Sequence, residues 1–143
     1  MPGIVVGVDG SDRSRKVLEW AAREAGAHNA ALTVITVNPV AGNYWTGTPE
    51  KYAADQPATE VVRQAAEDEV QKVLGQIGGP APASVTVRAV SGRASQELVA
   101  ASADADLVVV GSRGGGGFAK LMLGSVTSQV VAHAESPVAV IPV

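Results

Sequence analysis

Residues 4–11 read Ile4-Val5-Val6-Gly7-Val8-Asp9-Gly10-Ser11, and this stretch decides the fold class. The apolar run from Ile4 to Val8 is typical of a short strand that is buried on both faces. Asp9-Gly10 is a turn signal, and Ser11 belongs to the residue types that cap helices. Apolar residues then recur at helical spacing: Val17, Leu18, Ala21, Ala22 and Ala25. The stretch therefore predicts a buried strand that turns directly into a helix.

The rest of the chain repeats this alternation. We expect four further strands, at 31–37, 84–90, 106–110 and 137–142, and three further helices, at 59–77, 94–102 and 125–134. Residues 39–57 hold prolines, glycines and aromatic residues without a clear period, and a long loop is expected there. Apolar strands that alternate with helices predict an α/β fold, a doubly wound five-stranded parallel sheet in the order 3-2-1-4-5 with helices on both faces. Residues 1–143 are interpreted as one domain.

The composition argues against several classes of function. Apolar residues make up 46% of the 143 residues, yet no uninterrupted apolar run reaches the ~20 residues of a membrane span. The net charge is -3 and the basic residues are scattered, so nucleic acid is not an expected partner. The chain has no cysteine, and its first residues lack the basic region of a signal peptide. We therefore expect a cytoplasmic protein without a membrane segment.

The glycine-rich segment from Gly111 to Ser125 is the first candidate site, and it follows the fourth expected strand. Its glycines let backbone N–H groups approach an anion closely, and a helix that starts near Ser125 adds free N–H groups. Arg113 and Lys120 are available to offset phosphate charge. Taken alone, the segment is more simply interpreted as a flexible loop that ends in a helix cap. It is neither a P-loop nor a dinucleotide fingerprint, because its glycine spacing and its position differ from both.

Asp9 is the second candidate, at the end of the first expected strand. In a doubly wound sheet of this order, ligands bind outside the carboxyl ends of the strands where the strand order reverses. That point lies between the first and fourth strands, so Asp9 and Gly111 should face one crevice. Asp9 has a plain interpretation as a turn residue. The alternative is that its carboxylate accepts hydrogen bonds from ribose hydroxyls or the adenine amine, or joins a hydrated metal, and its position favours this alternative.

The spacing of the glycine segment resembles that of the universal stress protein family. The nucleotide-binding members of that family carry glycine, two residues, glycine, nine residues, then glycine and serine or threonine. Gly111, Gly114, Gly124 and Ser125 meet this spacing in full. One departure is Gly115, where the family often has arginine or another side chain.

The resemblance extends over the whole chain and implies that ATP binds in the crevice, with Mg²⁺ or Mn²⁺ on its phosphates. Asp9 would contact the nucleoside, the main chain of Val37 the adenine, and Gly111 the ribose. The remaining motif residues would contact the phosphates. The predicted cofactor-binding residues are Val8, Asp9, Gly10, Ser11, Val37, Val110, Gly111, Arg113, Gly114, Gly124, Ser125, Val126 and Thr127.

No catalytic residue is predicted. Phosphoryl transfer needs a positioned base and charge stabilisation, and the glycine segment has no carboxylate beside it. His28 and His133 are expected at the surface or in packing. We predict a stress-response or signalling module in which ATP sets conformation or partner binding. The alternatives are a slow ATPase or nucleotide-transferring enzyme, and an electron-transfer flavin protein.

The last expected strand, 137–142, forms an edge of the predicted sheet. Residues 138–141 are apolar on both faces, and unpaired edges invite pairing with another chain. The family resemblance also implies a homodimer through this strand. Pro137 and Pro142 bracket the strand and would equally protect the edge. A regulatory protein partner is expected without being identified.

Overall fold

The fold was analysed in a computed structural model, which describes residues 3–39, 59–112 and 124–143. The expected loop lies outside these residues apart from Pro39, and so do Arg113, Gly114 and Lys120. The elements, in chain order, are β1 (Ile4–Val8), α1 (Asp12–Ala27), β2 (Ala31–Pro39), α4 (Thr59–Ile77), β3 (Ser84–Gly92), α5 (Ala94–Ser102), β4 (Leu107–Gly111), α6 (Ser125–His133) and β5 (Val138–Ile141).

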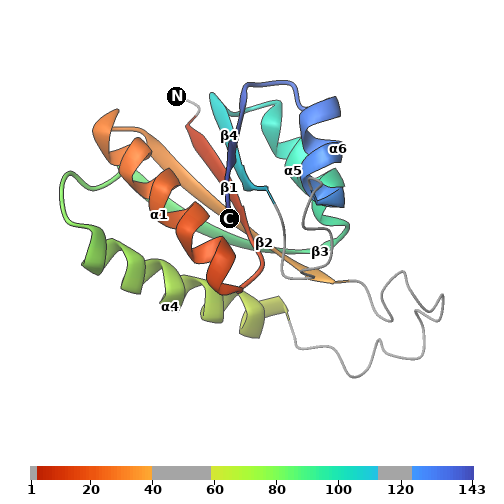
Figure 1. Ribbon diagram of the computed structural model, residues 1–143. Coiled ribbons are helices and arrows are strands. Elements are labelled where there is room, and N and C mark those ends of the chain that lie inside the picture. Colours follow the sequence, from red (N-terminus) through yellow and green to blue (C-terminus); the bar gives the residue numbers. More distant parts are fainter. Residues whose placement is uncertain (1–2, 40–58, 113–123) are drawn as a thin grey trace.

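The five strands form one sheet in the order β3-β2-β1-β4-β5, and every pairing is parallel. This confirms the predicted fold class and strand order. β1 is central, with Val8 opposite Thr36 on β2 and Ile4 opposite Leu107 on β4. The carboxyl ends of β1, β2 and β4 therefore lie at one end of the sheet (Figure 1).

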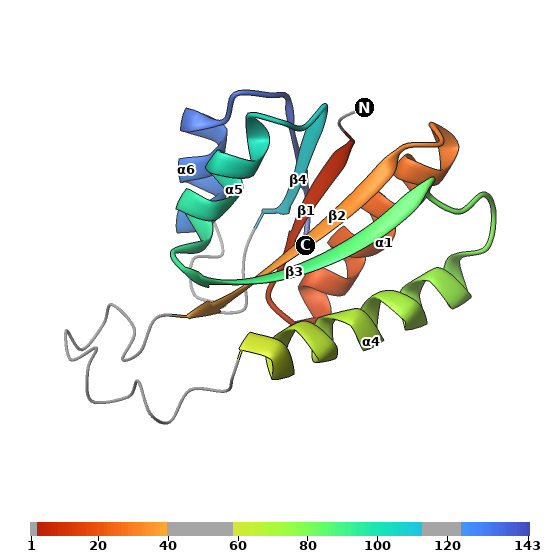
Figure 2. The same ribbon diagram turned by 180° about the vertical axis from the view of Figure 1, so that it is seen from behind.

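Helices cover both faces of the sheet, as predicted. α1 and α4 lie on one face, and α5 and α6 lie on the other (Figures 1 and 2). The core under α1 and α4 contains Ile4, Val6, Val17, Leu18, Ala21, Ala22, Ala25, Leu32, Val34, Val70, Val73 and Val109. The core under α5 and α6 contains Val5, Ile35, Leu98, Val108, Val110 and Val130. Alternate residues of each inner strand point to opposite cores, which is why these strands are apolar throughout.

The start of α1 forms as the sequence predicts. Ser11 is the N-cap, and its hydroxyl accepts a hydrogen bond from the Ser14 amide at 3.2 Å. Near the other end of the helix, Gly26 is buried, and a Cβ built there would lie 2.0 Å from the Pro80 carbonyl oxygen. The absent side chain thus lets the segment before β3 approach α1 closely.

Helical spacing in the sequence predicts one apolar face for α4, made of Val61, Val62, Ala65, Ala66, Val73, Leu74 and Ile77, but the helix buries only part of this face. Its fully buried residues are Val70 and Val73, whereas Val61 is 61% exposed. The cause is the position of the helix, because its second half packs on the sheet while its first half lines an open pocket. Among the described residues, no helix is both long enough and apolar enough to cross a membrane.

Candidate functional site

The β1–α1 turn is built by Asp9, Gly10 and Ser11. Asp9 Oδ1 accepts a hydrogen bond from the Ser11 amide at 2.9 Å, and Gly10 has a positive φ of 83° that favours glycine. Asp9 therefore has the turn role, and its side chain is also exposed at the carboxyl end of β1. Contact with a nucleoside remains a prediction.

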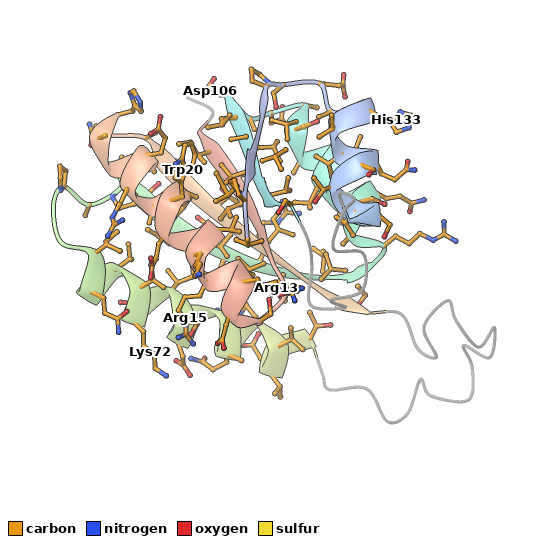
Figure 3. The ribbon with its side chains drawn as sticks, viewed as in Figure 1. Arg13, Arg15, Trp20, Lys72, Asp106 and His133 are labelled. Atoms are coloured by element: carbon orange, nitrogen blue, oxygen red, sulfur yellow. The ribbon has the colours of Figure 1, made fainter. Side chains whose placement is uncertain are left out.

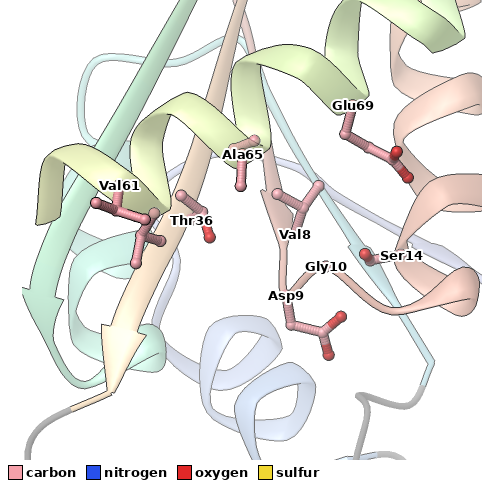
Figure 4. Close-up of a pocket in the computed structure, with 10 residues that line it drawn as sticks. Val8, Asp9, Gly10, Ser14, Thr36, Val61, Ala65 and Glu69 are labelled. Carbon is pink, nitrogen blue, oxygen red and sulfur yellow. The ribbon is translucent and has the colours of Figure 1, made fainter. Parts of the chain in front are cut away.

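A pocket of about 380 Å³ opens beside this turn, on the face of the sheet that carries α1 and α4. Its apolar lining comes from Val8, Val61, Val62, Ala65 and Ala66. The polar lining comes from Asp9, Gly10, Ser14, Thr36 and Glu69. Figure 4 shows Val8 and Thr36 on the strands, with Val61 and Ala65 facing them from α4. The small alanines keep the helix surface hollow here, so the space suits a flat apolar group with polar edges.

The side of the pocket towards α1 is formed by an ion pair. Arg15 Nε donates to Glu69 Oε1 at 2.7 Å, which joins α1 to α4. Arg15 extends from α1 towards α4, and the Glu69 carboxylate points to α1 (Figures 3 and 4). The hydrogen bond and the charge of Glu69 raise the pKa of Arg15. The positive charge of Arg15 therefore offsets the negative charge of Glu69 at the pocket wall.

The first half of α4 also carries its own ion pairs. Arg63 bonds to both Glu60 and Glu67, at spacings of three and four residues that face each other on a helix. The hydrogen bond from Arg63 lowers the pKa of Glu60, and the two carboxylates raise the pKa of Arg63. Arg63 is thus engaged within its helix, and no cation is among the described residues that line the pocket.

The end of β4 and the start of α6 lie on the other side of β1 from β2, and their residues are not among those that line the pocket. The Gly124 amide donates to the Ser112 carbonyl oxygen at 2.9 Å, so both ends of the glycine-rich segment meet. Thr127 is 4% exposed, and its hydroxyl donates to the Gly111 carbonyl oxygen at 2.5 Å. These two hydrogen bonds fix the first turn of α6 against β4.

The first turn of α6 begins with Gly124 as its N-cap, and Ser125 is the first residue of the helix. Ser125 is exposed, and Val126 packs against the core under α5 and α6. The amides in this turn lack carbonyl partners within the helix, which makes the turn a ready anion site. The helix begins where the sequence predicts, and phosphate contacts of Gly124 and Ser125 stay a prediction.

The remaining predicted residues divide into three groups. Val8 and Gly10 line the pocket, whereas the side chains of Val37 and Val110 pack into the core under α5 and α6. Val37 lies near the end of β2, and a contact of its main chain with adenine stays a prediction. Arg113 and Gly114 lie outside the described residues.

Sequence reasoning missed the contribution of Thr36, Ser14 and α4 to the pocket. One signal was present, because Leu32, Val34 and Thr36 alternate along β2 and only the last is polar. The pairing of Arg15 with Glu69 had no signal, since these residues are far apart in the sequence. His28 and His133 are exposed as expected, and His133 lies on the outer side of α6 (Figure 3).

The fold and this pocket define a doubly wound α/β protein whose candidate ligand site lies at the carboxyl ends of β1 and β2, next to the point between β1 and β4 where the strand order reverses. Residues 2–142 match the model of the Universal stress protein family, and the chain belongs to that family. Universal stress protein Mb2019 of Mycobacterium bovis is 38% identical over 151 residues, which cover 98% of this chain and 48% of that protein. The chain thus spans about half the length of the curated relatives it matches.

Solved structures of the family share the fold. Universal stress protein UspA from Lactobacillus plantarum has a TM-score of 0.78 and 24% identity, and the match covers 98% of this chain and 97% of that one. A universal stress protein in complex with cAMP has a TM-score of 0.64 and 28% identity, with 99% and 96% covered.

Proposed function

We propose that this chain, as one nucleotide-binding domain over residues 1–143, binds ATP at the carboxyl ends of β1, β2 and β4. The observation that carries the proposal is the complete glycine spacing from Gly111 to Ser125, together with the positions of its two ends. Gly111 ends β4 and Gly124 caps α6, and the two are tied together through Ser112 and Thr127. A solved relative that holds cAMP, another adenine nucleotide, supports the choice of ligand.

The ligand would lie across the strand ends. The free amides at the start of α6 suit the phosphates, and Asp9 at the end of β1 suits the ribose or base. The pocket under α4 suits the base, because it has apolar walls and polar groups at its edge. Val37 would contribute its main chain from the end of β2.

A divalent cation, Mg²⁺ or Mn²⁺, would enter with the nucleotide. Among the described residues, no three acidic or histidine side chains group to hold a metal ion. Mg²⁺ is commonly held by one or two carboxylates plus substrate phosphates, and this donor set fits that pattern. The protein groups that would serve as ligands of this cation are the Asp9 carboxylate and the Ser125 hydroxyl.

ATP would act as a ligand that sets conformation or partner binding in a stress-response or signalling module of the cytoplasm. The second candidate function, slow ATP hydrolysis or nucleotide transfer, is favoured only by the fold. β5 is an edge strand of the described sheet with half-buried residues, which supports a homodimer through residues 137–142. A regulatory protein partner completes the proposed module.

Calorimetric titration with ATP and Mg²⁺ tests the proposal. Gly114→Val should abolish binding, because a β-branched side chain in the glycine segment blocks close approach to phosphate. Gly75→Ala is the matched control, since Gly75 lies on α4 with nothing within 4 Å of an added Cβ. Wild-type affinity in Gly114→Val would refute ATP binding through this segment. If wild type releases phosphate from ATP much faster than Gly114→Val does, the alternative function as a slow ATPase is favoured. If the purified protein is yellow, the alternative function as a flavin protein is favoured.

A further inference from the structure

Thr36 is a polar residue in an apolar position. On β2, Leu32, Val34 and Thr36 point to the same face, and the first two belong to the core under α1 and α4. Thr36 is itself 6% exposed and lies opposite Val8 at the carboxyl end of the strand pair. Valine has nearly the same shape and an equal preference for strands, so packing alone does not call for a hydroxyl here.

The Thr36 hydroxyl makes no hydrogen bond to any residue in the described ranges. Figure 4 shows its oxygen directed into the pocket, between α4 and the β1–α1 turn. The hydroxyls of Thr127 and Ser102 do have protein partners, because Thr127 bonds to Gly111, and Ser102 bonds to Val99 and Glu135. The buried hydroxyl of Ser136 lacks a partner among the described residues, but Ser136 does not line the pocket. A hydroxyl that opens into a pocket and has no partner among the described residues is available to a group that enters the pocket from outside the protein.

The strand order indicates which part of a nucleotide would reach Thr36. β1 separates β2 from β4, so a ligand with its phosphates at the β4–α6 end crosses Asp9 before it reaches β2. The walls around Thr36 are apolar, from Val8, Val61 and Ala65, and the pocket has no basic lining residue in the part of the chain that the structure describes. This environment suits a heteroaromatic base and not a phosphate.

From these observations we propose that Thr36 is a specificity-determining residue whose hydroxyl hydrogen-bonds to the edge of the bound base. The inference rests on the proposed nucleotide function and deepens it. A hydroxyl both donates and accepts, and it therefore serves either a ring nitrogen or an exocyclic group. The partner class is a purine nucleotide, with ATP as the probe.

Titration of ATP into wild type, Thr36→Val and Thr36→Ser tests the inference. Thr36→Val removes one hydrogen bond to the ligand and should weaken ATP binding by about 3- to 10-fold. Thr36→Ser keeps the hydroxyl and should stay within about twofold of wild type. Thr86→Val is the matched control on β3, where the side chain is exposed, and it should bind ATP as wild type does.

Thermal unfolding without ligand separates this role from a structural one. Thr36→Val should unfold at the wild-type temperature or above it, because the substitution keeps the shape of the side chain and breaks no hydrogen bond to a described residue. A lower unfolding temperature together with unchanged ATP affinity would overturn the inference. Thr36→Val should weaken the binding of ATP and of dATP equally. If it weakens the binding of ATP alone, the Thr36 hydroxyl contacts the ribose and not the base, and this result would also overturn the inference.

The outcome also distinguishes the two proposals. If wild type binds ATP and Thr36→Val binds it equally well, the inference about Thr36 fails while the proposed function stands. If wild type binds neither ATP nor dATP, the proposed function fails and the inference fails with it.

Discussion

Thr127→Val is the most direct test of how the crevice is held together. The substitution keeps the size and branching of the side chain and removes the hydroxyl that donates to the Gly111 carbonyl oxygen at 2.5 Å. Thr127 is 4% exposed, so water does not readily replace the lost donor. Leaving a buried carbonyl without its partner costs about 1–2 kcal/mol. For a chain of this length, the expected fall in the unfolding temperature is about 3–7 °C.

The assay is thermal unfolding followed by circular dichroism, with Thr86→Val as the control. Thr86 is exposed on the edge strand β3, and its replacement should change the free energy of unfolding by less than about 0.5 kcal/mol. The ATP affinity of Thr127→Val should fall as well, because the start of α6 loses an anchor. An unfolding temperature at or above the wild-type value would refute the assigned role of this hydrogen bond. Thr36→Val is the opposite case, since its hydroxyl has no partner among the described residues and its loss should not destabilise the free protein.

Two further predictions concern packing and charge. Gly26→Ala places a Cβ 2.0 Å from the Pro80 carbonyl oxygen, and it should destabilise the fold by about 1–3 kcal/mol in urea titrations. Gly75→Ala is the control and should stabilise the fold slightly, because nothing lies within 4 Å of the added Cβ. Equal effects of the two substitutions would contradict the packing described for Gly26. Glu69→Gln breaks the ion pair with Arg15 and should lower the unfolding temperature in dilute buffer. The difference in unfolding temperature from wild type should shrink in 1 M NaCl, because salt screens an ion pair that is open to solvent. A difference that is independent of salt would show that charge is not the cause.

The strand and helix order could be predicted from the sequence because each strand is apolar throughout and each turn carries its own signal. The run from Ile4 to Val8 and the Ser11 cap both form where the sequence indicates. Parallel sheets bury both faces, so the order of apolar runs and helices leaves few topologies. The same reasoning placed Asp9 at the carboxyl end of β1, where it lines the pocket, whereas the predicted crevice between β1 and β4 stays a prediction.

The pocket could not be predicted, because it depends on how a helix lies over the sheet. Helical spacing marked Val61 as part of an apolar face, but spacing does not tell which turns of the helix reach the core. The Arg15–Glu69 ion pair could not be predicted for the same reason, because it forms only when α1 and α4 are neighbours. Thr36 was visible as a polar residue in an apolar alternation, yet its importance depends on the empty space beside it.

The carboxylates of the crevice bear on the choice between binding and turnover. Asp9 already accepts a hydrogen bond from the Ser11 amide, and Glu69 accepts one from Arg15. Both hydrogen bonds hold an oxygen of the carboxylate against a donor of the protein itself. A general base must lie within hydrogen-bond reach of the proton that it removes, and here one oxygen of each carboxylate is already bonded to a protein donor. The polar groups that line the pocket are therefore better suited to holding a nucleotide in place than to activating water against it.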